Sequence, residues 1–195
     1  MSFSQNNGIK TGIALSDIIS NENIDYLEGV AINPSIGFFR NLISRNHYNI
    51  QIGANYLQIG SSHTSSVEAR DIYNRPIGTV EITQKWDVQY IQLNLGIKPK
   101  VIIYKTIVYA IVEPSINYLI SFSSTAPKSE ETPFILGASI GCGSQFYEFS
   151  KMKYLFGEIR YCSDLMSFYK YYDYNISSDV KLWNTYCIFD FGVTF

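Results

Sequence analysis

Residues 183–195 alternate between apolar and polar positions. Successive side chains of a strand point to opposite faces of a sheet, so this period of two predicts a strand with two different faces. Large aromatic residues continue to the last position, whereas chain ends in water are usually polar and frayed, so the pattern indicates a wall that faces lipid. The apolar parity holds Trp183, Cys187, Phe189, Phe191, Val193 and Phe195, and the other parity includes Asn184, Asp190, Gly192 and Thr194.

The same alternation recurs in eight segments. Each is long enough to cross a bilayer as a tilted strand. Long polar connections alternate with short turns, which is typical of an up-and-down barrel with its long loops on one side of a membrane. We therefore predict an all-β fold, an eight-stranded antiparallel up-and-down transmembrane β-barrel that forms a single domain over residues 1–195. After a tail at 1–7, the expected strands are 8–17, 29–42, 48–59, 86–101, 107–121, 134–146, 153–163 and 181–195, and the long connections are 18–28, 60–84, 122–132 and 164–180.

Charged residues gather on the parity that would face the barrel interior. Three cations and three anions share this parity: Lys10, Lys98 and Arg160 with Glu113, Glu158 and Asp190. Eight strands enclose a space that side chains fill, which predicts a plugged polar interior and not a channel. Such charges must be paired, because leaving one buried partner alone costs roughly 3–5 kcal/mol.

The composition fits this reading. The 195 residues include 16 Tyr, 12 Phe and 2 Trp with only 16% charged residues, which favours strands. No run of about 18 apolar residues occurs, which excludes a transmembrane helix. The net charge of -2 and the lack of a basic run give no reason to expect nucleic acid as a partner. No secretory signal precedes Gly8, so we expect that a signal has been removed.

The three cysteines have no metal-ligand spacing, and no cofactor is expected. Strand parity places Cys142 and Cys187 outward and Cys162 inward. A disulfide between Cys142 and Cys162 is therefore not expected, and we interpret all three as packing residues.

Several stretches resemble the PorT-like outer-membrane β-barrel family, in the structural class of OmpA and OmpX. They are residues 8–16, Tyr90-Ile-Gln-Leu, residues 113–118 and Glu158-Ile-Arg-Tyr. The last strand also resembles the C-terminal assembly signal of outer-membrane barrels, through Phe189, Phe191, Val193 and Phe195. The resemblance implies a place in the bacterial outer membrane among membrane lipid and lipopolysaccharide. It also implies recognition of the last strand by the barrel-assembly machinery, and it carries over no catalytic residues.

Two motifs could indicate an enzyme. Gly137-Ala-Ser139-Ile-Gly141 matches a nucleophile elbow, but that motif needs a following helix, and here the strand pattern continues. His63-Thr-Ser65 resembles the H-x-S pair of lipid A deacylases, yet it falls at the start of a predicted loop. We expect no enzymatic activity, and a lipid-modifying barrel enzyme stays as an alternative.

Aromatic residues crowd the last long connection: Phe168, Tyr169, Tyr171, Tyr172 and Tyr174. They fit either an aromatic girdle at the membrane interface or a docking loop for another outer-membrane or surface protein. The predicted function is a structural or interaction module, such as a subunit of a larger outer-membrane or secretion complex. A soluble lipocalin-like binder of a small apolar ligand is the other alternative, and it would place the aliphatic parity inside.

Overall fold

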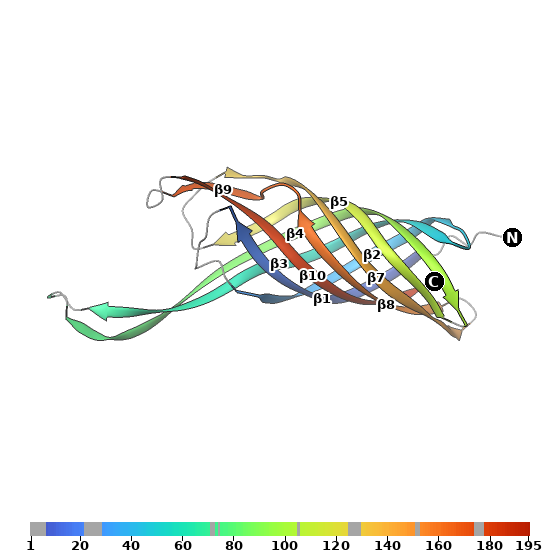
Figure 1. Ribbon diagram of the computed structural model, residues 1–195, viewed down its shortest axis with the longest axis horizontal. Helices are drawn as coiled ribbons and strands as arrows, with labels where there is room; N and C mark the ends of the chain where they lie inside the picture. Colours follow the sequence, from blue (N-terminus) through green and yellow to red (C-terminus); the bar gives the residue numbers. More distant parts are fainter. Residues whose placement is uncertain are drawn as a thin grey trace.

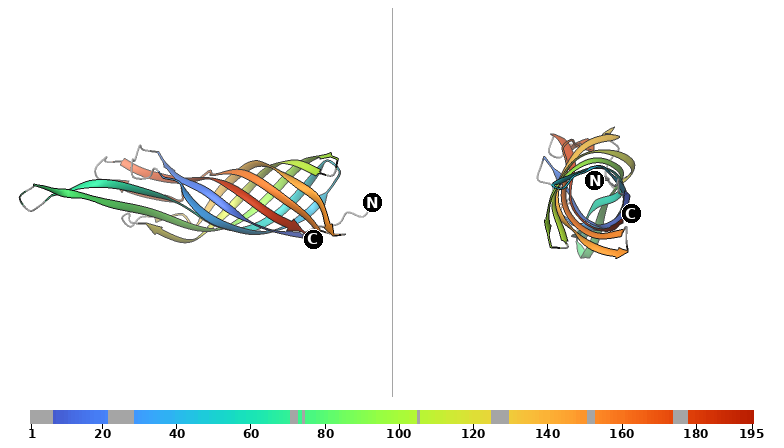
Figure 2. Two further views of the ribbon diagram at one scale, coloured as in Figure 1. Left: turned by 90° about the horizontal axis from the view of Figure 1, so that it is seen from below. Right: turned by 90° about the vertical axis from the view of Figure 1, so that its right-hand side faces the viewer.

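The computed structural model describes residues 7–21, 29–70, 73, 75–104, 106–124, 130–150, 153–173 and 178–195. Within these residues eight antiparallel strands form a closed ring, which confirms the predicted barrel (Figures 1 and 2). Strands β1 and β10 close it with a register that runs from Gly8↔Thr194 to Ser20↔Leu182. The ring consists of β1 (Asn7–Ser20), β2 (Ala31–Ser44), β3 (Tyr48–Arg70), β4 (Pro76–Ile103), β5 (Thr106–Ser124), β7 (Phe134–Ser150), β8 (Lys153–Asp164) and β10 (Ser178–Thr194).

One end of the barrel, the short-turn end, carries the β2–β3, β4–β5 and β7–β8 turns. Both ends of the described chain meet there, because Asn7 N donates to Phe195 O at 3.0 Å and Phe195 N donates to Asn7 O at 2.8 Å. Tyr104, in the β4–β5 turn, takes the left-handed conformation, with a φ of 54°. The opposite end is the loop end. The described residues contain no helix that could span a membrane.

Two short strands at the loop end fall inside connections that were predicted as plain loops. Strand β9 (Tyr169–Asp173) pairs with β10, and β6 (Glu130–Glu131) pairs with β9. Lys181↔Lys170 and Glu130↔Lys170 are among the pairs. The sheet therefore folds a small flap onto the last strand of the ring.

The prediction of a loop at 60–84 is wrong. Strands β3 and β4 stay paired far beyond the ring, through Thr64↔Thr83 and Val67↔Val80 to Arg70↔Pro76, and they project as a long hairpin (Figure 1). Thr and Val favour strands. The apolar alternation stops at Ile59 because the hairpin leaves the barrel body there and has no core to pack against. The periodicity therefore failed to reveal a strand that the backbone still forms.

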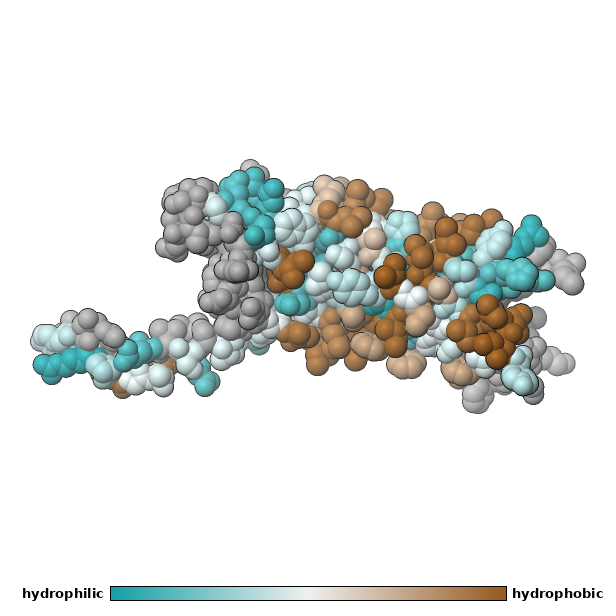
Figure 3. All heavy atoms as spheres, in the orientation of Figure 1, coloured by the Kyte–Doolittle hydropathy of each residue, from teal (hydrophilic) through white to brown (hydrophobic). Residues whose placement is uncertain are grey.

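The outer face of the barrel body is aliphatic. Ile13, Ile52, Leu93 and Ile159 are each about half exposed although they are large and apolar. Figure 3 shows hydrophobic side chains gathered over the barrel body, whereas the coloured residues of the projecting hairpin are mostly hydrophilic. A lipocalin would have the opposite arrangement. The belt also includes Ile36, Phe38, Leu95, Ile97, Val112, Ile116, Leu136, Ile140, Tyr161 and Phe191.

The interior differs from the predicted polar plug in its loop-end half. The short-turn half and the middle hold buried charged and amide side chains, as expected. Towards the loop end the inward positions become aliphatic and aromatic, because both parities of several strands are apolar there. The buried apolar cluster contains Ala14, Ile18, Leu57, Ile59, Trp86, Val88, Tyr90, Leu119, Ile135, Cys162, Phe168, Tyr169, Val180, Leu182, Tyr186 and Ile188.

Candidate functional site in the barrel interior

Six charged residues from five strands meet inside the barrel, and we call them the charged layer: Lys10, Lys98, Glu113, Glu158, Arg160 and Asp190. At most 6% of any of them is exposed. Arg160 joins two acids, since its Nη1 lies 2.8 Å from Glu113 Oε2 and its Nη2 bonds to Asp190. Lys98 bonds to Glu158. Three positive and three negative side chains therefore balance each other within one layer.

Lys10 joins the two acidic sides of this layer. Its Nζ lies 3.4 Å from Asp190 Oδ2 and 3.9 Å from Glu158 Oε2. Neutral donors complete the coordination of the acids: Tyr109 OH donates to Glu158 at 2.9 Å, Ser35 Oγ to Asp190 at 3.0 Å, and Asn94 Nδ2 to Glu113 at 2.9 Å. Each carboxylate thus accepts hydrogen bonds as well as facing a cation, which a buried charge requires.

Glycines on the inward parity make room for this layer. A Cβ at Gly12 would lie 2.0 Å from Phe189 O and 2.6 Å from Asp190 Oδ1, and one at Gly141 would lie 2.1 Å from Ile159 O. Gly141 belongs to the nucleophile-elbow match, but the strand continues through it and Ser139 is buried beside Glu113. The motif is therefore part of a barrel wall.

An amide network lies next to the charged layer. Gln92 is at its centre: its Oε1 accepts from Asn55 at 3.0 Å, and its Nε2 donates to Asn117 Oδ1 and Tyr186 OH, each at 3.1 Å. Asp164 accepts from Asn117 Nδ2 at 3.0 Å. Gln92 has the inward parity of Lys98 on the same strand, and Asn117 that of Glu113.

Asn184 completes this network. Its Nδ2 donates to Asp164 Oδ2 at 2.7 Å and to Tyr90 OH at 2.8 Å. Asp164 was not predicted as a lumen residue, because it follows directly after the predicted strand 153–163. A strand end set one residue later would have placed it on the inward parity with Arg160 and Cys162.

The lumen is closed at the loop end by an aromatic plug, formed by Trp86, Phe122, Phe168 and Tyr169. The Tyr169 ring lies 4.7 Å from Phe122 and 5.9 Å from Trp86, and Phe168 lies 5.8 Å from Phe122 (centroid distances). Phe168 is 0% and Tyr169 3% exposed. The prediction that these two residues belong to an interfacial girdle or a docking loop is therefore wrong, because the flap carries them into the barrel mouth.

The remaining candidates have different positions. Tyr171 and Tyr172 pair with Val180 and Asp179 across the β9–β10 ladder, and Tyr174 lies outside the described residues. His63 and Ser65 belong to the projecting hairpin, opposite Gln84 and Ile82. The three cysteines are free, with Cys142 exposed and Cys162 buried. Among the described residues no group of His, Cys, Asp and Glu could hold a metal ion.

The four residues of the predicted C-terminal assembly signal share the outward parity of the last strand. Phe191 is 69% and Phe195 48% exposed on the outer face, and Phe189 and Val193 share their parity with partial exposure. They lie at the short-turn end, where β10 pairs with β1 on one side and β8 on the other.

A closed strand ring, an aliphatic outer belt and a buried ionic interior together define an integral outer-membrane β-barrel. Its short-turn end is the periplasmic side and its loop end the extracellular side. No family model matches the chain, and no curated protein matches it in sequence.

Solved structures show the same fold at low sequence identity. The chain is similar to Neisserial surface protein A (NspA), with 9% identity, 97% of each chain covered and a TM-score of 0.53. It is also similar to the outer membrane protein OprG from Pseudomonas aeruginosa, with 10% identity, coverage of 99% of this chain and 97% of that chain, and a TM-score of 0.56. The chain thus has the fold of bacterial outer-membrane β-barrels.

Proposed function

We propose that this protein is a closed outer-membrane anchor that presents its β3–β4 hairpin to another protein at the cell surface, as a subunit of a larger outer-membrane assembly. The charged layer, the amide network and the aromatic plug fill the lumen, which argues against transport through it. The projecting hairpin is the observation that carries the proposal.

Both long sides of the hairpin are open. On the β3 side, the ladder with β2 ends at Ser35↔Leu57, and a single bridge, Val30↔Ser61, follows. On the β4 side, the ladder with β5 ends at Trp86↔Ser124. Among the described residues no other strand pairs with the hairpin beyond these points. An open strand edge is a template for an added strand, which is a common mode of protein recognition.

The hairpin has one polar face that suits a water-exposed docking element. Thr64 and Thr83 lie opposite each other with their hydroxyls 3.1 Å apart, and Ser66 pairs with Glu81. All four residues are exposed. Such a face keeps the hairpin soluble outside the membrane while its backbone edges remain available.

The test replaces residues 62–85 by a short Gly-containing turn between Ser61 and Trp86, which already face each other in the register. The barrel should keep its heat-modifiable electrophoretic mobility, and the proteins that co-purify from native membranes in mild detergent should be lost. A matched variant, Ser66→Lys with Thr83→Lys, keeps the hairpin but hinders strand addition. It should lose the same proteins. An unchanged set of co-purifying proteins in both variants would reject the proposal.

We also propose that the barrel-assembly machinery recognises the outward aromatic residues of β10. Phe195 → Ser should slow insertion into vesicles that contain this machinery and leave spontaneous folding in detergent unchanged. Equal slowing in both settings would indicate a role in stability alone. Lipopolysaccharide is the proposed lipid neighbour of the extracellular half of the belt.

We propose that the protein is not an enzyme. His63 and Ser65 lie on a two-stranded projection, and their resemblance to the H-x-S pair is the only support for the deacylase alternative. Ser65→Ala should leave the lipid A of cells that express the barrel unchanged, as judged by mass spectrometry. Loss of a deacylated species in this variant would favour the enzyme.

A further inference from the structure

A row of outward positions near the periplasmic end is interrupted by small residues. Across neighbouring strands the row reads Ser144, Gly157, Phe191 and Thr11, from the pairs Ser144↔Gly157, Phe191↔Gly157 and Thr11↔Phe191. Three of these four positions carry little side chain. The Phe191 side chain therefore projects from the outer face, with a small residue on each neighbouring strand, Gly157 on one side and Thr11 on the other.

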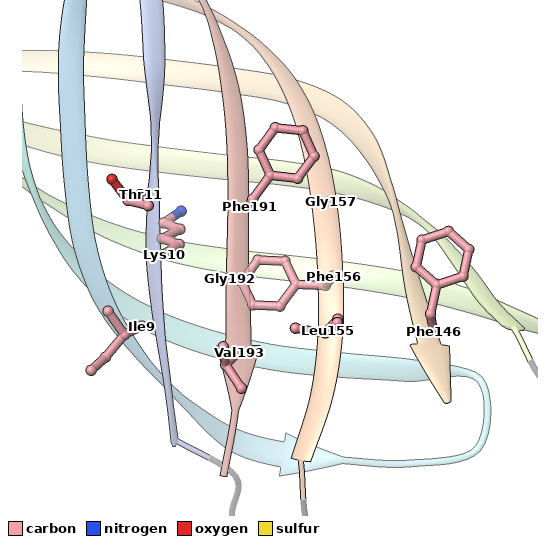
Figure 4. Close-up of a pocket in the computed structure, with 10 residues that line it drawn as sticks. All are labelled: Ile9, Lys10, Thr11, Phe146, Leu155, Phe156, Gly157, Phe191, Gly192 and Val193. Atoms are coloured by element: carbon pink, nitrogen blue, oxygen red, sulfur yellow. The ribbon is translucent and has the colours of Figure 1, made fainter. Parts of the chain in front are cut away.

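The rows on either side of it are bulky. Towards the periplasm lie Phe146, Leu155, Val193 and Ile9, and towards the extracellular side lie Ile159, Phe189 and Ile13. The result is a groove of about 660 Å³ over Gly157 and Thr11, adjoined by a second one of about 430 Å³ on the Cys142 side of Phe191. Figure 4 shows the Phe191 and Phe146 rings on the strands that flank the strand of Gly157.

This groove is part of the lipid-facing surface. It is continuous with the aliphatic belt, which is the interface of the barrel with acyl chains, and it lies in the half that faces the inner leaflet. Its walls are aliphatic and aromatic, and the Thr11 hydroxyl already donates to Ser35 O at 3.2 Å. A polypeptide partner would bring backbone polar groups that need hydrogen bonds in the membrane, whereas an acyl chain brings none.

We propose that the groove over Gly157 is a binding site for one acyl chain of an inner-leaflet phospholipid, seated beside the Phe191 ring. The chain enters from the periplasmic interface, where β8 begins at Lys153 and β10 ends at Thr194. The site is independent of the extracellular hairpin. A lipid bound in this groove has a longer residence time than lipids elsewhere on the belt.

The experiment uses vesicles of phosphatidylethanolamine and phosphatidylglycerol that contain a trace of phosphatidylethanolamine with a diazirine in one acyl chain. After irradiation, adducts are mapped by peptide mass spectrometry. Peptides with Phe146, Leu155 or Phe191 should carry several-fold more label than the β3 peptide with Ile52, on the opposite wall. Gly157→Leu should reduce this excess to the level of the opposite wall.

The Gly157 position tolerates a side chain, since its Cβ would lie 3.6 Å from the Phe191 ring, an ordinary contact. Gly157→Ala should give a smaller reduction in labelling. Ala54→Leu, the same kind of enlargement at an exposed outward position of β3, should leave the excess unchanged. Heat-modifiable mobility confirms that each variant is folded.

Equal labelling around the whole belt, or an excess that survives Gly157→Leu, would overturn the proposal. A Gly157→Cys variant that cross-links efficiently to a second copy through this position would also overturn it, because another barrel would then occupy the groove. Failure of the hairpin deletion test leaves this proposal untouched, since the two sites lie on opposite ends of the barrel.

Discussion

Arg160 shows how single residues hold this interior together. Its guanidinium bonds Glu113 and Asp190 from two other strands while it is 1% exposed. A planar guanidinium can serve two carboxylates at once, which a lysine ammonium does less well. Arg160 is therefore the residue on which the balance of the charged layer depends most.

Arg160→Met should destabilise the barrel by about 3–5 kcal/mol, because Glu113 loses its paired cation, Asp190 keeps only Lys10, and the buried layer is left with one negative charge in excess. Urea unfolding in phospholipid vesicles measures this loss. Lys170→Met is the control, since Lys170 pairs with Asp179 at 3.2 Å on the surface and about half of each side chain is exposed. An exposed pair contributes roughly 0–1 kcal/mol.

Neutralising Glu113 as well should restore much of this stability. In the double variant Arg160→Met with Glu113→Gln, two cations and two acids remain in the layer, because Lys10 and Lys98 still face Asp190 and Glu158. A double variant that is less stable than Arg160→Met would show that the pairs themselves, and not the unpaired charge, determine the loss.

At the residue scale, sequence parity identified all six members of the charged layer. The lumen of an eight-stranded barrel is narrow, so charged side chains on the inward parity lie close to one another. It could not identify which acid pairs with which cation. The partners come from strands that are distant in sequence, such as β5, β8 and β10, and their meeting depends on the stagger of the closed ring.

Among the elements, β9 was the hardest to predict. A Tyr-rich segment has the same composition whether it lies at a membrane interface or fills a barrel mouth. Its burial depends on pairing with β10, where Leu182↔Tyr169 sets the register. The hairpin extension of β3 and β4 was missed for the opposite reason, because a strand outside the membrane needs no apolar face.

Phe168→Ala should destabilise the barrel by roughly 3–5 kcal/mol, since it removes a fully buried aromatic side chain from the plug. Phe38→Ala removes the same atoms from the outer face, where Phe38 is 48% exposed to lipid, and should cost much less. Urea unfolding of both variants in the same vesicles provides the comparison. Equal losses would mean that the plug contributes no packing beyond that of a lipid-facing residue.

For the whole molecule, the alternation of eight segments was sufficient to predict the ring and its two ends. The layering of the lumen was not predictable in the same way. Near the loop end both parities are apolar, as in Tyr56, Leu57 and Ile59, so the alternation that separates inside from outside disappears. The interior therefore changes from ionic to aromatic along the axis without a clear signal in the sequence.

Two separate layers close the lumen, and this gives a prediction for conductance. In planar bilayers the protein should form no stable ion-conducting pore. The double variant Phe168→Ala with Tyr169→Ala should also remain closed, because the charged layer still fills the middle of the barrel. Single-channel recording measures this. Discrete conductance steps in the double variant would show that the plug alone is the barrier.

The charged layer makes the pairing of the first and last strands sensitive to register. Lys10 comes from β1 and meets Asp190 on β10 and Glu158 on β8. A slip of one position along the β1–β10 seam would turn Lys10 towards the acyl chains and leave the acids with one cation fewer. A misaligned barrel would thus place one charge in lipid and leave one buried acid without a cation, so the ionic interior stabilises the correct register over its neighbours.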